Sequence, residues 1–244
     1  MAIWQDPQTT GVNRATVTVP SAARDVGLRS YMLKVYNYMA SGVLLTGIIA
    51  LLFAPYAAGV LLTPTGMSPL GWIVTLSPLA IVFAMSFGVN RMQTGTLQLL
   101  FWAFAGLMGL SMSTLFLVFT GVSIAQTFFA TAAAYLALSL YGYTTKRDLS
   151  GFGTFLIMGV VGILVAMLVN MFLQSSAMAL AISAIGVLLF AGLTAYDTQR
   201  IKSMYFHVQG TDMAGKTVIM GALTLYLDFI NMFQFLLSFM GSRR

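Results

Sequence analysis

Residues 97–143 read LQLLFWAFAGLMGLSMSTLFLVFTGVSIAQTFFATAAAYLALSLYGY, and no charged side chain interrupts them. A helix that crosses a bilayer needs about 20 mostly apolar residues. The stretch is about twice that length, so it predicts two membrane-spanning helices. We place the turn between them at Thr120-Gly121, because glycine often marks a turn in an otherwise helical pattern.

The same lack of charge extends over the whole chain of 244 residues. Only 7% of the residues are charged and 59% are hydrophobic, whereas soluble domains carry roughly 25% charged residues. This composition excludes water-soluble enzymes and indicates that lipid is the main solvent. The sequence has no cysteine, which excludes disulfides, thiolate metal sites and cysteine nucleophiles. Glutamate is absent too, so six aspartates are the only carboxylates.

Outward from residues 97–143, the apolar pattern repeats. Residues 152–196 form a second double-length run, which we divide at the polar residues 174–176. The predicted spans are seven: 36–54, 70–89, the two halves of 97–143, the two halves of 152–196, and 217–240. The fold class is therefore an all-α, polytopic membrane protein. We expect residues 197–216 to form a linker outside the membrane.

The positions of the basic residues predict the orientation. The chain divides into a polar tail, residues 1–34, which we expect to be disordered or to lie on a surface, and a membrane domain, residues 35–244. Ten of the 12 basic residues lie in the tail or in alternate connections. By the positive-inside rule, we expect the N-terminus to be cytoplasmic. We therefore interpret the net charge of +6 as a sign of membrane orientation and not of nucleic-acid binding. Arg243 and Arg244 alone disagree, so the seventh segment either crosses the membrane or dips in and returns.

Polar residues recur at helical spacing in the last two predicted spans. In residues 217–240 they form one stripe opposite the Leu, Ile and Phe residues that face lipid or apolar neighbours: Gly221, Thr224, Asp228, Asn231, Gln234 and Ser238. In the sixth span a shared face carries Ser183, Gly186, Thr194 and Asp197. We expect these two faces to meet, with Thr194, Thr224, Asn231 and Gln234 as candidates to line a polar path.

Asp228 is the residue whose position most requires an explanation. A charged aspartate at a helix centre costs about 2.5–3.5 kcal/mol, so Asp228 should face the bundle interior. Low dielectric disfavours its ionised form, and a nearby Asp197 would disfavour it further, so the two would share a proton. Alternatively, a neutral Asp228 only makes a structural hydrogen bond to a neighbouring helix, and Asp197 forms an interfacial ion pair with Arg200 or Lys202. Arg91 is either an orientation signal or a gate that pairs with the carboxylates at the cytoplasmic mouth.

Few kinds of chemistry are compatible with these residues. Serine and zinc proteases need a base or a histidine cluster that the spans lack. Two aspartates could perform intramembrane aspartyl proteolysis, but the Gly-x-Gly pattern of such proteases is replaced by Leu225-Tyr226-Leu227, so we expect no enzyme. An ion path needs only oxygens, a gate and a protonation switch. Because calcium takes six to eight oxygens, Asp197 and Asp228 could hold it only weakly and transiently, and no cofactor is expected.

Three short runs resemble a known family. Ala195-Tyr196-Asp197-Thr198-Gln199, Leu225-Tyr226-Leu227-Asp228-Phe229-Ile230-Asn231 and Ser86-Phe87-Gly88-Val89-Asn90-Arg91 are similar to segments of the Bax inhibitor-1 family, the last to its bacterial members. The resemblance covers essentially everything after residue 30.

This resemblance implies a fold and a function. It implies six helices around a central seventh, in the inner membrane of a bacterium, and an aspartate dyad at Asp197 and Asp228. It also implies an arginine latch, for which Arg91 is the candidate, and a pH-sensitive calcium leak. Some bacterial relatives instead regulate a membrane-anchored AAA protease, so the alternative is a non-conducting regulator whose polar tail binds such a protease.

Overall fold

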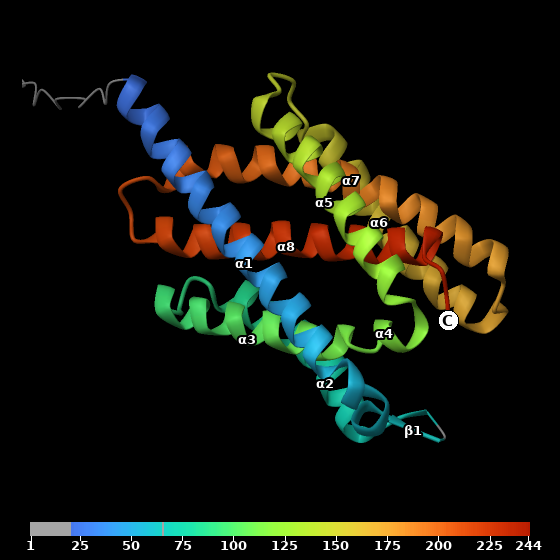
Figure 1. Ribbon diagram of the computed structural model, residues 1–244. Coiled ribbons are helices and arrows are strands. Elements are labelled where there is room, and N and C mark those ends of the chain that lie inside the picture. Colours follow the sequence, from blue (N-terminus) through green and yellow to red (C-terminus); the bar gives the residue numbers. More distant parts are fainter. Residues whose placement is uncertain (1–20, 65) are drawn as a thin grey trace, which may run out of the picture.

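The computed structural model describes residues 21–64 and 66–244, with side chains from Asp25 onward (Figure 1). In these residues, seven helical segments are long and apolar enough to cross a membrane, which confirms the seven-span, all-α fold class. The elements are α1 Ser21–Leu61, β1 Leu62–Thr63, β2 Gly66–Met67, α2 Pro69–Gly88, α3 Thr94–Met112, α4 Leu115–Val118, α5 Gly121–Thr144, α6 Ser150–Leu173, α7 Ser176–Val208 and α8 Met213–Met240. The two strands form a short antiparallel hairpin between α1 and α2.

Local capping explains the two breaks that divide the double-length runs. The Thr120 hydroxyl accepts the backbone N–H of Ser123 and starts α5, so the predicted turn at Thr120-Gly121 is confirmed. Gln174 ends α6 in the left-handed conformation at φ 50°, and the Ser175 hydroxyl accepts the N–H of Met178 to start α7. A polar side chain at a helix start satisfies backbone donors that have no partner within the helix.

Two helices extend beyond the predicted spans. Helix α1 begins at Ser21, within the segment assigned to the tail, and continues through Pro55 to Leu61. Helix α7 continues past Asp197 to Val208, so the prediction of a linker over residues 197–216 was wrong, and only residues 209–212 connect α7 to α8. The reason is that Thr198 and Ile201 are buried while Arg200 is exposed, which makes this part of α7 amphipathic. The predicted protease-binding role of the tail falls mainly on residues 1–20, outside the described part of the chain.

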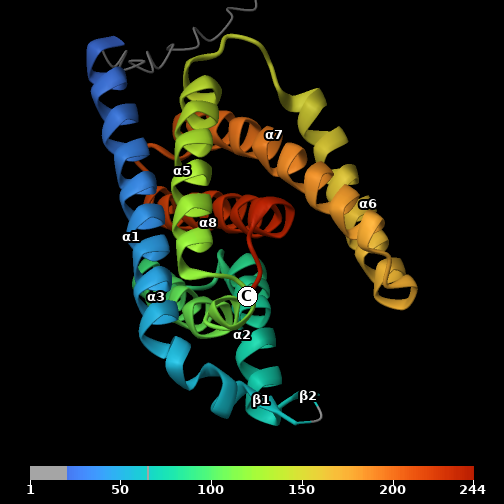
Figure 2. The ribbon, with the colours of Figure 1, turned by 45° about the vertical axis from the view of Figure 1, so that its right-hand side comes forward.

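Helix α8 lies at the centre of the bundle. It packs directly against α1, α3, α5 and α7, while α2 packs on α3 and α6 packs on α7 (Figures 1 and 2). The central position of the last helix is therefore as expected, but its direct cover comes mainly from four helices. The Leu, Ile and Phe residues opposite its polar stripe face these neighbours: Leu223, Leu225, Phe229, Ile230, Phe233 and Leu237 are buried.

Helix α8 runs the full length of the bundle. At its start, the Lys216 Nζ lies 3.5 Å from the carbonyl oxygen of Asn90, in the α2–α3 turn. Beyond its end, the N–H of Arg244 donates to the Val118 carbonyl over 3.0 Å, and the N–H of Thr120 donates to the Ser242 carbonyl over 3.1 Å. The last helix therefore crosses from one end of the bundle to the other and does not dip and return (Figure 1).

A buried hydrogen-bonded link joins α8 to α1 and α3. The Thr46 hydroxyl donates to the Ala105 carbonyl over 2.8 Å, and the Tyr226 hydroxyl, 2.6 Å from the Thr46 oxygen, donates to Thr46. We expect Tyr226→Phe to lower the free energy of unfolding by about 1 kcal/mol, the usual net worth of one such hydrogen bond. Thermal unfolding in detergent measures the change. Tyr141→Phe is the control, because Tyr141 is exposed; equal midpoints for both variants would contradict the expectation.

Candidate functional site

The structure brings Asp197 and Asp228 together. They lie on α7 and α8, which pack along each other, and their carboxyl groups are close enough to share a hydrogen bond. Both residues are buried, at 7% and 4% exposure. Asp228 therefore faces the bundle interior, and Asp197 lies within a continuous helix rather than at its end.

A hydrogen bond between two carboxyl groups requires a proton on one of them, because a carboxylate oxygen can only accept. Among the residues whose side chains are described, the cation paired with these carboxyl groups is Arg200, whose Nη1 lies 4.0 Å from Oδ1 of Asp197, one turn along α7. Its charge favours a negative Asp197. Asp228 is the more deeply buried of the two residues, so the shared proton is best placed on Asp228. Asp228 then donates the hydrogen bond and Asp197 accepts it.

Hydroxyl groups from α1 and α5 form a hydrogen-bonded chain to Thr198, the residue after Asp197. The Ser139 hydroxyl on α5 lies 3.0 Å from that of Thr198 on α7 and 2.5 Å from that of Tyr36 on α1. One turn earlier on α5, the Tyr135 ring packs edge-on against Phe229, with 5.5 Å between ring centroids. The hydroxyl of Tyr135 and the Oδ2 of Asp228 are both buried and have no hydrogen-bond partner in the described part of the chain.

The unpaired Tyr135 hydroxyl leads to a prediction. A buried polar group without a partner costs about 1–3 kcal/mol, so Tyr135→Phe should leave the thermal unfolding midpoint unchanged or raise it. A structural role for the hydroxyl requires the opposite, a lower midpoint. Tyr226→Phe is the matched comparison, since it removes a buried hydroxyl that has a partner.

A cavity of about 270 Å³ connects Asp197 to the end of the bundle where α7 meets α8. Arg200 and the side chains of Thr217 and Thr224 line it together with Asp197, and Val89, at the end of α2, closes one side. Asp228 is not among its lining residues. From this end, the cavity therefore gives access to threonine oxygens, Arg200 and Asp197, but not to Asp228.

The other predicted lining residues are distributed along two helices. Thr194 is fully buried and donates to the Phe190 carbonyl within α7. Thr224 lines the cavity, and Asn231 donates to the Leu227 carbonyl over 2.8 Å. Asn231 and Gln234 are half-buried on the less covered side of α8. The structure thus brings Thr224 close to the aspartate pair and places Asn231 and Gln234 further along α8.

Arg91 does not contact the aspartates in this structure. It lies exposed in the turn after α2, and among residues 25–64 and 66–244 the one ion pair is that of Arg200 with Asp197. Arg200 is therefore the cation at the pair. The three-residue spacing of Asp197 and Arg200 is the sequence signal for this contact, because residues three apart on a helix are neighbours.

The described residues do not form a metal site with several protein ligands. They contain no group of three or more His, Asp or Glu side chains that could hold a metal ion. Calcium normally takes six to eight oxygen ligands. The two carboxylates and nearby hydroxyls could accordingly provide only part of a coordination shell.

Comparisons with known proteins agree with this architecture. Residues 28–244 match the model of a family described as inhibitor of apoptosis-promoting Bax1. The chain is 46% identical over 221 residues to the inner membrane protein YbhL of Escherichia coli K12, covering 89% of this chain and 94% of YbhL. It is 48% identical over 230 residues to protein RP147 of Rickettsia prowazekii, covering 94% of this chain and 96% of RP147. The chain therefore belongs to the Bax inhibitor-1 family.

Proposed function

We propose that the protein is a passive cation leak, with calcium as the expected ion, gated by the proton that Asp197 and Asp228 share. The observation that supports this most strongly is the buried carboxyl pair, close enough to share a hydrogen bond, between the central helix and its closest neighbour. Intramembrane ionisable residues are costly and commonly mark ion or proton pathways. A purely structural contact between α7 and α8 would not need two acids.

The surroundings of the pair suit transit rather than storage of an ion. The cavity at Asp197 offers one carboxylate and the hydroxyl oxygens of Thr217 and Thr224. Conduction requires binding that is strong enough for entry and weak enough for release. Proteolysis is less well supported, because aspartyl catalysis needs both carboxyl groups to face one water, whereas only Asp197 lines the cavity.

Flux into liposomes tests the proposal. Purified protein is reconstituted with a calcium-sensitive dye inside the vesicles, and uptake is compared for wild type and the double variant Asp197→Asn, Asp228→Asn. We expect the double variant to lose its response to pH. A pH response equal to that of wild type would remove the aspartate pair from the mechanism.

Arg200 replaces Arg91 as the cation that holds the closed state. Arg200 approaches Asp197 to 4.0 Å, whereas Arg91 is exposed and apart from the pair. We expect Arg200→Gln to raise flux at neutral pH several-fold, because it removes the charge that favours the acceptor form of Asp197. Arg91→Gln removes an equal charge and should leave flux within about twofold of wild type, since exposed charges at longer range are largely screened. The opposite ranking would restore Arg91 as the latch.

We also propose that the chain lies in an inner membrane, as the name of YbhL states for that protein, with its N-terminus cytoplasmic. The basic residues of the α2–α3 and α5–α6 connections, and those at the adjoining ends of α7 and α8, support this orientation. Because the sequence contains no cysteine, single substitutions provide a clean test. A membrane-impermeant maleimide added to intact spheroplasts should label Ser242→Cys and not Gly210→Cys, and the reverse pattern would invert the orientation.

A further inference from the structure

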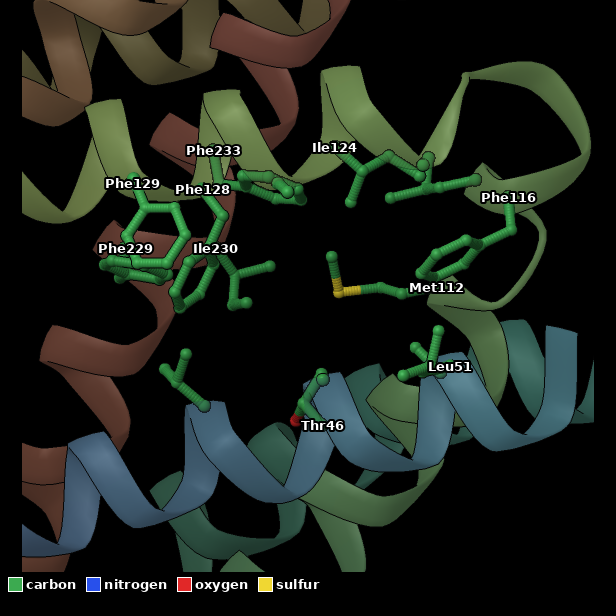
Figure 3. A pocket seen from close by; sticks show the side chains of 16 residues that line it. Thr46, Leu51, Met112, Phe116, Ile124, Phe128, Phe129, Phe229, Ile230 and Phe233 are labelled. Carbon is green, nitrogen blue, oxygen red and sulfur yellow. The ribbon is translucent and has the colours of Figure 1, made fainter. Parts of the chain in front are cut away.

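An apolar cavity of about 420 Å³ lies between α1, α5 and α8, with α3 and α4 at one end (Figure 3). Its walls carry no charged side chain, and Thr46 is the one polar side chain among its lining residues. The Thr46 hydroxyl is already bonded to the Ala105 carbonyl and to Tyr226. The cavity therefore offers no free hydrogen-bonding side chain to a water, an ion or a polar ligand.

The mouth of the cavity lies between α1 and α5, on the lateral surface of the helical bundle. Leu51 and Phe129 flank it and are 61% and 70% exposed. Gly47 also lines it, and a Cβ added there would meet no atom within 4 Å. The floor is formed by α8, where Ile230 and Phe233 are each 4% exposed. Figure 3 shows the side chains of Ile230, Phe233, Met112 and Thr46 around an open centre.

We propose that this cavity binds one acyl chain of a bilayer lipid, which enters between α1 and α5 and reaches α8. The mouth belongs to segments apolar enough to span a membrane, so it opens towards hydrocarbon, and an uncharged chain matches a wall without charges. If a methylene occupies about the 30 Å³ of a water molecule, the cavity volume corresponds to roughly 14 methylenes. That is the scale of one lipid tail.

Size also excludes a helix of a second copy as the occupant. One turn of an α-helix, about 5.4 Å long and 10 Å across, takes up roughly 400 Å³. The cavity therefore has room for about one turn, which is too little to seat a helix. Water is excluded as well, because apolar cavities without polar partners stay dry.

The acyl chain would fill a gap between α1 and α5 that lies beyond their hydrogen bond at Tyr36 and Ser139. Helices α1 and α5 both pack on α8, and the cavity separates them along residues 43–51 and 121–129. A chain in this space would contact Phe229, the residue after Asp228, and would fill the gap between α1 and α5. Lipid binding as proposed here does not depend on the leak function, so either proposal can fail without the other.

Photo-crosslinking distinguishes a bound chain from lipid that only surrounds the protein. The full chain is reconstituted in phosphatidylethanolamine and phosphatidylglycerol vesicles containing a small fraction of phosphatidylcholine with a diazirine in one acyl chain. After illumination, adducts are mapped by mass spectrometry. Surrounding lipid can reach exposed residues such as Leu51 and Phe129, but only a chain inside the cavity can reach the buried Ile230 and Phe233. We expect adducts on the buried lining residues within 229–233, namely Phe229, Ile230 and Phe233, and adducts on the half-buried Asn231 are not counted.

A matched pair of variants completes the test. Gly47→Phe places a ring in the mouth of the cavity and should reduce the adducts on residues 229–233 at least fivefold. Gly162→Phe on α6 adds the same ring where a Cβ also meets no atom within 4 Å, and it should leave the adducts unchanged. Absence of adducts on residues 229–233 in wild type, or equal adducts in the two variants, would overturn the proposal. Because the wild-type result is decisive alone, the test survives poor folding of Gly47→Phe.

Discussion

Calcium flux through the reconstituted protein should pass through a minimum as pH is varied. The hydrogen bond between Asp197 and Asp228 needs one shared proton, so the closed arrangement selects the singly protonated pair. At higher pH the proton is lost, and the two carboxylates repel each other; like charges in close contact repel by about 4 kcal/mol at an effective dielectric constant of 20. At lower pH a second proton neutralises Asp197, which weakens the charge-assisted hydrogen bond and discharges the ion pair of Asp197 with Arg200. Flux should therefore rise on both sides of the minimum.

Asparagine substitutions distinguish the rise in flux above the pH minimum from the rise in flux below it. In Asp228→Asn the amide N–H donates permanently to Asp197, which imitates the protonated partner, so the alkaline rise should disappear and the acid rise should remain. A repulsion of a few kcal/mol corresponds to more than tenfold in an equilibrium, so we expect the alkaline difference between wild type and Asp228→Asn to exceed tenfold. The double variant Asp197→Asn, Asp228→Asn should show neither the acid rise nor the alkaline rise in flux.

Dye-loaded liposomes prepared at a series of pH values provide the measurement, with equal pH on both sides of the membrane. Asp148→Asn is the control, because Asp148 is an exposed carboxylate in the α5–α6 loop; it should reproduce the wild-type profile. An alkaline rise that persists in Asp228→Asn would show that the shared proton does not hold the closed state.

The spans could be predicted because charge and capping are local properties. Thr120, Gln174 and Ser175 mark helix ends through hydrogen bonds to residues within five positions. The polar spacing around Asp228 indicated which side of the last helix meets α7. Each of these features needs no knowledge of distant neighbours, so the sequence carries it directly.

The remaining features depend on packing between distant segments. The sequence prediction ended the sixth helix too early, because the charged residues mark the end of the apolar stretch. The helix α7 continues past them, with Ile201 buried. Tyr135 joined the site only through its contact with Phe229 on another helix. The cavity between α1 and α5 has no sequence signature, since its lining residues, apart from Thr46, are ordinary apolar residues from five helices.

Gly142→Ala should destabilise the protein although alanine favours helices. Gly142 is buried in α5, and a Cβ there would lie 2.2 Å from the carbonyl oxygen of Ala195 and 2.9 Å from its Cα. These are backbone atoms of α7, so no flexible side chain can yield, and one helix must move. Small residues allow such close approach between membrane helices. Overpacking typically costs about 1–3 kcal/mol, which exceeds the gain in helix propensity of up to about 1 kcal/mol.

Thermal unfolding in detergent, followed by tryptophan fluorescence, measures this effect. At about 2–4 °C per kcal/mol for a chain of this size, the midpoint should fall by roughly 5 °C. Gly151→Ala is the control, because a Cβ at Gly151 meets nothing within 4 Å, and it should not lower the midpoint. Since Ala195 precedes Asp197 by two residues, a displaced α7 also moves one carboxyl group away from the other. Gly142→Ala should therefore raise calcium flux at the pH of the wild-type minimum, while equal midpoints for the two variants would show that α5 and α7 are not locked at this contact.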